Sequence, residues 1–283
     1  MSIVINHLTF AYTQGGKPLD PTLKDLTFTI EEGIFLGIIG HTGSGKSTFV
    51  KHLNGLLPCE KDTVVVDGHD LSFKSERKTV RALVGMVFQY PEYQLFAETV
   101  FEDVAFGPRN MKLDESEVKS RVQNALTLVG LDPERFHSRS PFELSGGERR
   151  RAAIAGVLAM HPKYLVLDEP MAGLDPLGRH EILALLEKLR SESGCTIIMI
   201  SHSMDDIANH ATKVLVLDRG SVFLYDTPQN VFSKAEELQR IGLSVPSVTK
   251  ICIEMNRKGI AVPTEICTED AFLNWIREEQ QHA

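Results

Sequence analysis

A glycine-rich segment constrains the fold of this chain more than any other part of the sequence. Residues 40–48 read Gly-His-Thr-Gly-Ser-Gly-Lys-Ser-Thr and fit the pattern G-x-x-x-x-G-K-[ST]. An apolar run over residues 34–39 precedes the segment, and a helical pattern over residues 49–57 follows it. The order strand, glycine-rich loop and helix predicts a phosphate-binding loop in an α/β fold. The alternative is a glycine turn that happens to precede a helix.

The chemistry expected of this loop is anion binding. Its glycines let backbone N–H groups point inward at a phosphate, and the following helix adds the positive end of its dipole. Lys46 supplies a full charge to the β- and γ-phosphates, and the Ser47 hydroxyl is a candidate Mg²⁺ ligand. The nucleotide-binding residues expected in the loop are Gly40, His41, Thr42, Gly43, Ser44, Gly45, Lys46, Ser47 and Thr48.

The composition excludes several classes of partner. The chain is 42% apolar and 24% charged, as is ordinary for a soluble globular protein, and its formal net charge is −8. An acidic balance argues against a nucleic-acid partner and against adhesion to anionic lipid. No apolar run reaches the roughly 18–20 residues that span a bilayer, and the first residues lack a signal-peptide pattern. The four cysteines form no C-x-x-C pair, which is typical of a reduced cytosolic setting.

Three later apolar runs end in polar side chains, in the place where parallel strands bind ligands. Gln89 follows one run and is expected to reach the metal or the attacking water. Asp168 and Glu169 end another; because neighbouring strand residues face opposite ways, we assign Asp168 to the metal and Glu169 to the water. His202 follows the third and is expected to contact the γ-phosphate. The alternatives are a strand-capping glutamine, a solvated acidic pair and a structural histidine.

Two other regions carry candidate binding residues. Ser145-Gly146-Gly147 opens a helical run over residues 148–160 and predicts a second anion-binding helix terminus. The three arginines at 149–151 are expected on a solvated face or in salt bridges. Residues 90–110 are crowded with aromatic side chains, which indicates either a docking surface for another protein or a small satellite core. Tyr12 follows the first strand and is placed either to stack on a base or to pack.

The order of these motifs resembles the ATP-binding cassette (ABC) ATPases over about residues 2–235. The motifs are the phosphate loop, Gln89, residues 144–148, residues 167–169, residues 173–175 and His202. The resemblance implies an α/β P-loop NTPase core of the RecA-like type, with an antiparallel β subdomain and an α-helical subdomain at about residues 90–160. It also implies that two cassettes pack head to tail, so that the Leu-Ser-Gly-Gly of one closes over the ATP held by the other.

The same resemblance implies a role for each site residue. The catalytic residues are Glu169 as the base, His202 as the switch histidine and Gln89. The Mg²⁺ ligands are Ser47 and Gln89, beside Asp168. The residues that contact ATP outside the loop are Tyr12 on adenine, Ser145, Gly146, Gly147, Glu148 near the ribose, and Asp175 across the dimer.

Residues 88–96, residues 99–108 and the tail after residue 239 resemble a narrower group, the energy-coupling factor (ECF) transporter ATPases. This implies an ATP-hydrolysing subunit that powers uptake of vitamins or transition-metal ions. The implied partners are a second, EcfA1-like ATPase, an EcfT-like transmembrane subunit bound through the Gln89–Pro108 region, and a substrate-binding S component. The implied location is peripheral, at the cytoplasmic face of the cell membrane. The expected domains are residues 1–238 and a small dimerisation domain at 239–283.

Two rival classes remain open at this point. A soluble cassette ATPase that works on DNA should carry a long coiled-coil insertion, and one that works on ribosomes should carry two cassettes; neither pattern is present. A non-enzymatic binding module should lack a water-activating group, whereas Glu169 and His202 are both present.

Overall fold

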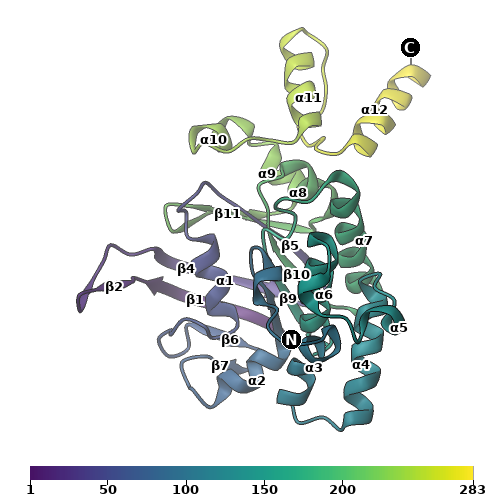
Figure 1. Ribbon diagram of the computed structural model, residues 1–283. Coiled ribbons are helices and arrows are strands. Elements are labelled where there is room, and N and C mark those ends of the chain that lie inside the picture. The colour runs from purple at the N-terminus through teal and green to yellow at the C-terminus, as the bar shows by residue number, and fades with distance from the viewer. Residues whose placement is uncertain (283) are drawn as a thin grey trace.

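A six-stranded sheet runs through the middle of the computed structural model, which describes residues 1–282 (Figure 1). The strand order is β12-β11-β5-β10-β9-β8, and every neighbouring pair is parallel except β11 with β12. The parallel strands are almost entirely buried because both faces of the sheet are covered. The strands are β5 (Phe35–Ile39), β8 (Val84–Val87), β9 (Tyr164–Asp168), β10 (Thr196–Ile200), β11 (Lys213–Asp218) and β12 (Ser221–Asp226).

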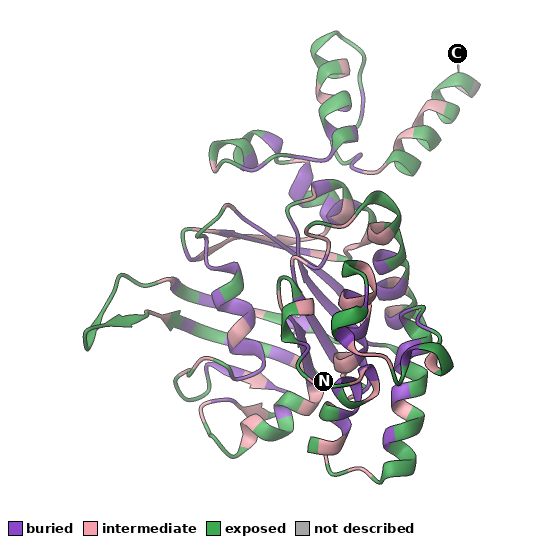
Figure 2. Cartoon of the chain, viewed as in Figure 1, coloured by how far each residue is buried: buried purple, intermediate pink, exposed green. Residues whose placement is uncertain are grey.

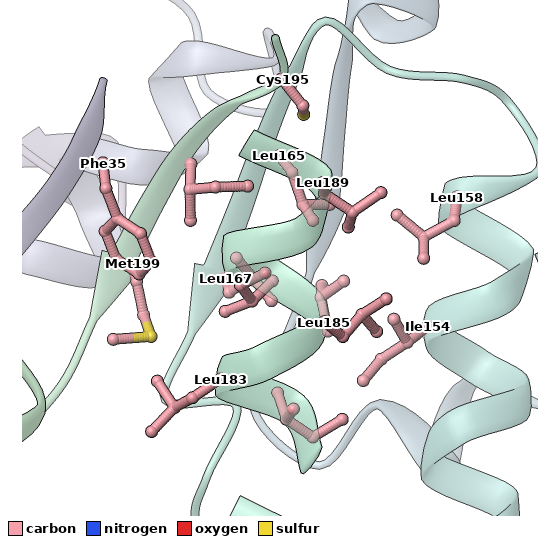
Figure 3. Packing of buried hydrophobic residues seen from close by; sticks show 14 of the residues in the cluster. Phe35, Ile154, Leu158, Leu165, Leu167, Leu183, Leu185, Leu189, Cys195 and Met199 are labelled. Carbon is pink, nitrogen blue, oxygen red and sulfur yellow. The ribbon is translucent and has the colours of Figure 1, made fainter. Parts of the chain in front are cut away.

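Side-chain alternation along these strands divides the interior into two apolar cores. In β9, Leu165 and Leu167 face one core, whereas Tyr164 and Val166 face the other. The first core lies between the sheet and two long helices, α6 (Gly146–Leu158) and α7 (Pro176–Ser193). Figure 3 shows this core, in which the helices contribute Ile154, Leu158, Leu183, Leu185 and Leu189.

The second core separates the parallel sheet from an antiparallel sheet of order β4-β1-β6-β7. Helix α1 (Lys46–Leu53) buries Phe49, Val50 and Leu53 in this core. The antiparallel strands are β1 (Ser2–Phe10), β4 (Leu23–Glu31), β6 (Val64–Val66) and β7 (His69–Asp70). Helix α2 (Glu76–Leu83) follows β7, and β2 (Thr13–Gln14) and β3 (Lys17–Pro18) form a separate exposed hairpin.

A bulge in β1 explains why its apolar residues alternate only in part. Ile3 and Ile5 are buried, but the next buried residue is Leu8, so the alternation slips by one position. His7 has φ 52°, and the register with β4 shifts between Ile5 and Leu8. An extra residue in one strand of a pair turns the following side chains to the other face. The bulge therefore returns Leu8 to the core.

The segment between β8 and β9 is helical and packs on the first core. Thr99 caps α3 by accepting a hydrogen bond from the N–H of Glu102 (3.2 Å). Apolar side chains of α3, α4 and α6 meet in the core, among them Val104, Val122 and Ile154. The elements are η1 (Pro91–Gln94), α3 (Val100–Asn110), α4 (Glu115–Leu128), α5 (Pro133–Phe136), η2 (Pro141–Glu143) and α6. The expected α/β fold with a helical part is confirmed.

The last part of the chain packs partly on the sheet and partly on itself. Leu243, Val245 and Cys267 belong to the first core. A separate small cluster holds Val248, Cys252, Val262 and Ile266, with Met255, Phe272 and Trp275 beside it. The helices are α8 (Met204–His210), α9 (Pro228–Phe232), α10 (Ala235–Arg240), α11 (Ser247–Arg257) and α12 (Glu269–His282). Figures 1 and 2 show α11 and α12 projecting from the body with mostly exposed residues.

Helix α11 is amphipathic only in part. The spacing of Val248, Ile251 and Cys252 predicts one apolar face, but Ile251 is 49% exposed, whereas Val248 and Cys252 are buried. Within residues 1–282, every helix is too short or too polar to cross a membrane.

Candidate functional site

The expected site residues follow neighbouring strands of the parallel sheet. The phosphate loop follows β5, Asp168 ends β9, and Ser201 and His202 follow β10. Since β5, β10 and β9 are adjacent and parallel, their carboxyl ends lie at one edge of the sheet. The sheet therefore brings together residues that are far apart in the sequence.

Close packing fixes the shape of the phosphate loop. A Cβ at Gly40 would lie 2.4 Å from the carbonyl oxygen of Leu217 and 2.5 Å from Ser44 Oγ, so only glycine fits. Gly45 caps α1 with φ 102°, in the left-handed region that favours glycine, and a Cβ there would lie 2.7 Å from Leu23 Cδ2. The helix begins at Lys46 rather than at the expected residue 49. The loop therefore leads directly into a helix N-terminus, the arrangement that binds anions.

Lys46 lies inside this loop. Its Nζ donates hydrogen bonds to the carbonyl oxygens of Gly40 (2.6 Å) and His41 (3.0 Å). Burial lowers the pKa of Lys46, whereas the nearby charges of Glu169 and Asp168 raise it. The ammonium group is thus held inside the loop, where a bound phosphate would meet it, with Glu169 and Asp168 close enough to act on its charge.

His41 ties the phosphate loop to the end of β11. Its Nε2 lies 3.0 Å from Asp218 Oδ1, and its Nδ1 lies 2.8 Å from the carbonyl oxygen of Thr42. The two contacts fix the plane of the imidazole between the phosphate loop and the end of β11. Asp218 was not among the expected site residues, because nothing in the sequence pairs it with His41.

The chain turns where the two adjacent carboxylates stand. Asp168 is the last residue of β9, and Glu169 has φ 51°, a conformation that side chains other than glycine seldom adopt. Burial raises the pKa of Asp168, and a hydrogen bond with Ser47 lowers it. Asp168 therefore faces the Ser47 hydroxyl, whereas the turn aims Glu169 elsewhere.

The three residues expected to be catalytic meet at one carboxylate. Gln89 Nε2 donates to Glu169 Oε2 (3.1 Å), and His202 Nε2 lies 2.8 Å from Glu169 Oε1. Glu169 and His202 border a cavity of about 380 Å³, together with Arg179 and residues 200–203. A water in this cavity could contact Glu169 and His202 at once.

The second helix terminus has the geometry of a capping box. Ser145 Oγ accepts from the N–H of Glu148 (3.3 Å), and Glu148 Oε2 accepts from the N–H of Ser145 (2.8 Å). These hydrogen bonds, with the backbone bond as the larger cause, lower the pKa of Glu148. A Cβ at Gly146 or Gly147 would meet nothing within 4 Å. The described residues show no contact of Ser145 with the phosphate loop, so this terminus faces open space.

Tyr12 and Asp175 are held at the surface. The Tyr12 hydroxyl lies 3.2 Å from Thr48 Oγ1 on α1, and its ring packs edge-on against Phe10. Asp175 caps α7 by accepting from the N–H of Gly178 (2.8 Å). Tyr12 therefore lies beside the phosphate loop helix, and Asp175 marks an exposed helix start.

The aromatic segment does not form a satellite core. Tyr93 is 85% exposed and Phe96 is 63% exposed. Phe96 packs edge-on against Phe106, and both border a groove of about 830 Å³ that also reaches α2 and Met160 of the segment after α6. Large exposed aromatic side chains beside a groove are typical of a protein-docking surface.

Of the two expected environments for the arginines, Arg150 has the salt bridge, but its side chain is buried. Its guanidinium is only 5% exposed and pairs with Glu92 at 3.1 Å. Arg151 pairs with Glu181 on α7 and is partly exposed. Sequence spacing could not reveal these pairs, because each partner lies on a distant segment.

Known proteins match this chain closely. A family model described as "ABC transporter" matches residues 23–172. The chain is 47% identical over 283 residues to the energy-coupling factor transporter ATP-binding protein EcfA2 of Caldanaerobacter subterraneus subsp. tengcongensis, covering 100% of this chain and 96% of the relative. It is 50% identical over 278 residues to the EcfA2 of Symbiobacterium thermophilum, covering 98% of this chain and 96% of the relative.

Solved structures agree with these relatives. The cbiO1 protein of Clostridium perfringens, part of the ABC transporter complex cbiONQ, is similar with a TM-score of 0.72 and 37% identity, over 84% of this chain and 93% of that chain. The ATP-binding cassette MJ0796, solved as a dimer bound to ADP and Pi, is similar with a TM-score of 0.70 and 29% identity. The match covers 80% of this chain and 98% of that chain. The chain therefore belongs to the ABC transporter ATPases and, within them, to the EcfA2 ATP-binding proteins of energy-coupling factor transporters.

Proposed function

We propose that this ATPase binds ATP with Mg²⁺ in a closed pair with a second, EcfA1-like ATPase subunit, and that closing and opening of the pair drives an EcfT-like transmembrane subunit. The transported solutes are vitamins or transition-metal ions, delivered by a substrate-binding S component. The observation that carries the proposal is the meeting of Gln89, Glu169 and His202 beside a complete phosphate loop.

The residues at the sheet edge fit a magnesium ion. Mg²⁺ prefers oxygen ligands and is held by few protein groups, together with waters and substrate phosphates. The Ser47 hydroxyl, the Gln89 amide and the buried Asp168 carboxylate supply such oxygens, and the Ser47 side chain is near enough to Asp168 to lower the pKa of that carboxyl. The ion would neutralise charge on the phosphates.

The protein groups around the phosphates then act by position and charge. The loop N–H groups and Lys46 bind the β- and γ-phosphates, and Glu169 accepts a proton from the attacking water. His202 bonds Glu169 Oε1, which fixes the carboxylate and leaves the imidazole near the γ-phosphate. Tyr12 stacks on the adenine beside α1.

A second subunit is needed to complete each nucleotide site. The start of α6, at residues 145–147, is an exposed helix N-terminus that can bind an anion. Ser145 and Glu148 form its capping box, and within residues 1–282 it makes no contact with the phosphate loop. Asp175 is similarly exposed at the start of α7. Both termini can serve a nucleotide held by the partner, as the dimeric form of the related cassette MJ0796 suggests. The tail at residues 239–283 is the proposed dimerisation domain, next to the cassette at residues 1–238.

The transmembrane subunit docks on the groove beside the aromatic segment. We call residues 89–108 the docking segment. Phe96 and Phe106 border its groove, and Asp103 accepts hydrogen bonds from the N–H groups of Phe96 (3.2 Å) and Ala97 (3.0 Å). These bonds hold the exposed aromatic side chains in place for a partner helix. The chain is thus peripheral, at the cytoplasmic face of the membrane.

Co-purification tests this function. The chain, with an affinity tag, is co-expressed with a candidate EcfT-like subunit and a second ATPase, and the complex is extracted from membranes and identified by mass spectrometry. The proposal expects a multi-spanning subunit and a second ATPase to be retained in equal amounts, with ATP turnover. Recovery of the chain without a multi-spanning partner would refute the transport role, even if ATP is hydrolysed.

A further inference from the structure

Arg150 lies at a buried junction of three segments that are far apart in the sequence. It belongs to the first turns of α6, yet its guanidinium is 5% exposed. A buried charged group is destabilising unless its donors are paired. The partners of Arg150 therefore show what the structure requires at this position.

Two sets of acceptors surround this guanidinium. Nε and Nη2 donate to the two carboxylate oxygens of Glu92, at 3.2 and 3.1 Å, which is a bidentate pair. Nη1 donates to the carbonyl oxygens of Pro170 (3.3 Å) and Ala172 (2.6 Å). Glu92 lies in the docking segment, whereas Pro170 and Ala172 lie in the loop that follows Glu169.

The neighbouring arginine shows that this bonding is particular to one position. Arg151 is 28% exposed and donates one hydrogen bond to a side chain, that of Glu181 (3.1 Å). That contact joins α6 to α7 and reaches neither the docking segment nor the loop after Glu169. Arg151 is therefore a matched control on the same helix.

We propose that Arg150 is a positioning residue that makes the docking segment and the loop after Glu169 move together. The guanidinium is planar and rigid, so a displacement of Glu92 changes the direction of the bonds to Pro170 and Ala172, and the reverse also holds. A lysine keeps the charge but cannot present this fork to four acceptors. The docking role of Glu92 rests on the proposed function; the coupling within this chain does not.

Hydrogen exchange on the purified chain tests the coupling, and it needs no membrane partner. Amide exchange is measured by mass spectrometry over residues 90–95 and 170–173, with and without a non-hydrolysable ATP analogue. In the parent chain, the analogue should slow exchange in both segments. In Arg150→Lys, affinity for the analogue should be unchanged, but the slowing at residues 90–95 should be lost. Arg151→Lys should behave as the parent chain does.

Two further readouts separate positioning from a merely structural role. In the assembled ATPase, Arg150→Lys should lower kcat about 10-fold with KM for ATP unchanged, because the loop after Glu169 is misplaced. Glu92→Gln, which weakens the other end of the junction, should also uncouple the two segments in the exchange experiment. Loss of ATP affinity together with thermal stability would show a structural role and overturn the proposal. So would slowing at residues 90–95 that survives in a folded Arg150→Lys chain.

Discussion

The imidazole of His202 lies against the carboxylate of Glu169, with Nε2 2.8 Å from Oε1, although the two residues follow different strands. The contact exists because β9 and β10 are parallel neighbours and because the chain turns at Glu169. Gln89, after β8, donates to the other oxygen of the same carboxylate. Each oxygen of the Glu169 carboxylate therefore has a partner. The two contacts fix the orientation of the carboxylate, which a base needs in order to meet an attacking water.

Glu169→Gln should abolish turnover and keep nucleotide binding. The amide has nearly the same shape but cannot accept the proton of the attacking water, so kcat should fall by about 100-fold or more. ATP affinity should be retained, and the ATPase pair should stay closed, which size-exclusion chromatography with ATP detects. Hydrolysis at the parent rate would show that Glu169 is not the base.

Removing the exposed aromatic side chains should uncouple transport from hydrolysis. Tyr93→Ala and Phe96→Ala remove exposed side chains that do not line the cavity beside Glu169 and His202, so ATP turnover in detergent should stay near that of the parent. Solute uptake by reconstituted vesicles should fall because the membrane subunit loses its contact area. Phe73→Ala, at an exposed aromatic residue that does not line the groove, serves as the control. If turnover and uptake disappear together, these side chains support folding instead.

His52 should make the protein less stable in mild acid. Burial lowers its pKa from 6.5 to about 4, and neither ring nitrogen has a partner within residues 1–282. The folded state therefore favours the neutral ring, and its stability is lost as the pH falls from about 6.5 towards 4. His52→Leu should reduce the loss of unfolding free energy between pH 7.5 and 4.5 by about 2.5 kcal/mol.

Urea unfolding at the two pH values measures this difference. His180→Leu, at an exposed position on α7, should retain the pH dependence of the parent. An equal pH dependence in His52→Leu and the parent would mean that the ring is not kept neutral by burial.

Gly40→Ala should weaken nucleotide binding. Its Cβ would lie 2.4 Å from a backbone oxygen that cannot move away, so the phosphate loop must shift. Overpacking of this kind costs about 1–3 kcal/mol, which corresponds to about a 5- to 150-fold loss of affinity if the whole cost falls on the nucleotide-bound loop. Gly156→Ala within α6, where a Cβ would come no nearer than 3.9 Å to another group, should bind as the parent does. Equal affinities, measured by calorimetry, would remove the packing argument for Gly40.

Local patterns in the sequence predicted the parts of this structure that depend on local chemistry. The phosphate loop, the buried strands and the polar residues at their ends follow from spacing alone. Sequence alternation could not place the bulge at His7, because it depends on the register with a second strand. The pairing of Arg150 with Glu92 and of Asp218 with His41 could not be predicted for the same reason, because only the tertiary fold brings these partners together.

The resemblance to a family supplied what spacing could not. Nothing local distinguishes Ser145 as a residue that serves a second subunit's nucleotide, because its hydrogen bonds are those of an ordinary capped helix. In the part of the chain that the structure describes, this helix terminus is exposed and makes no contact with its own phosphate loop. Its exposure is the one structural observation that favours a role at another subunit's nucleotide.

The most direct test of the account is a structure of the assembled ATPase pair carrying Glu169→Gln, with ATP and Mg²⁺ bound. We predict that the Ser145 hydroxyl lies within hydrogen-bonding distance of the γ-phosphate of an ATP held in the partner's phosphate loop. A closed assembly in which Ser145 faces solvent, and each ATP is enclosed by one subunit alone, would contradict it.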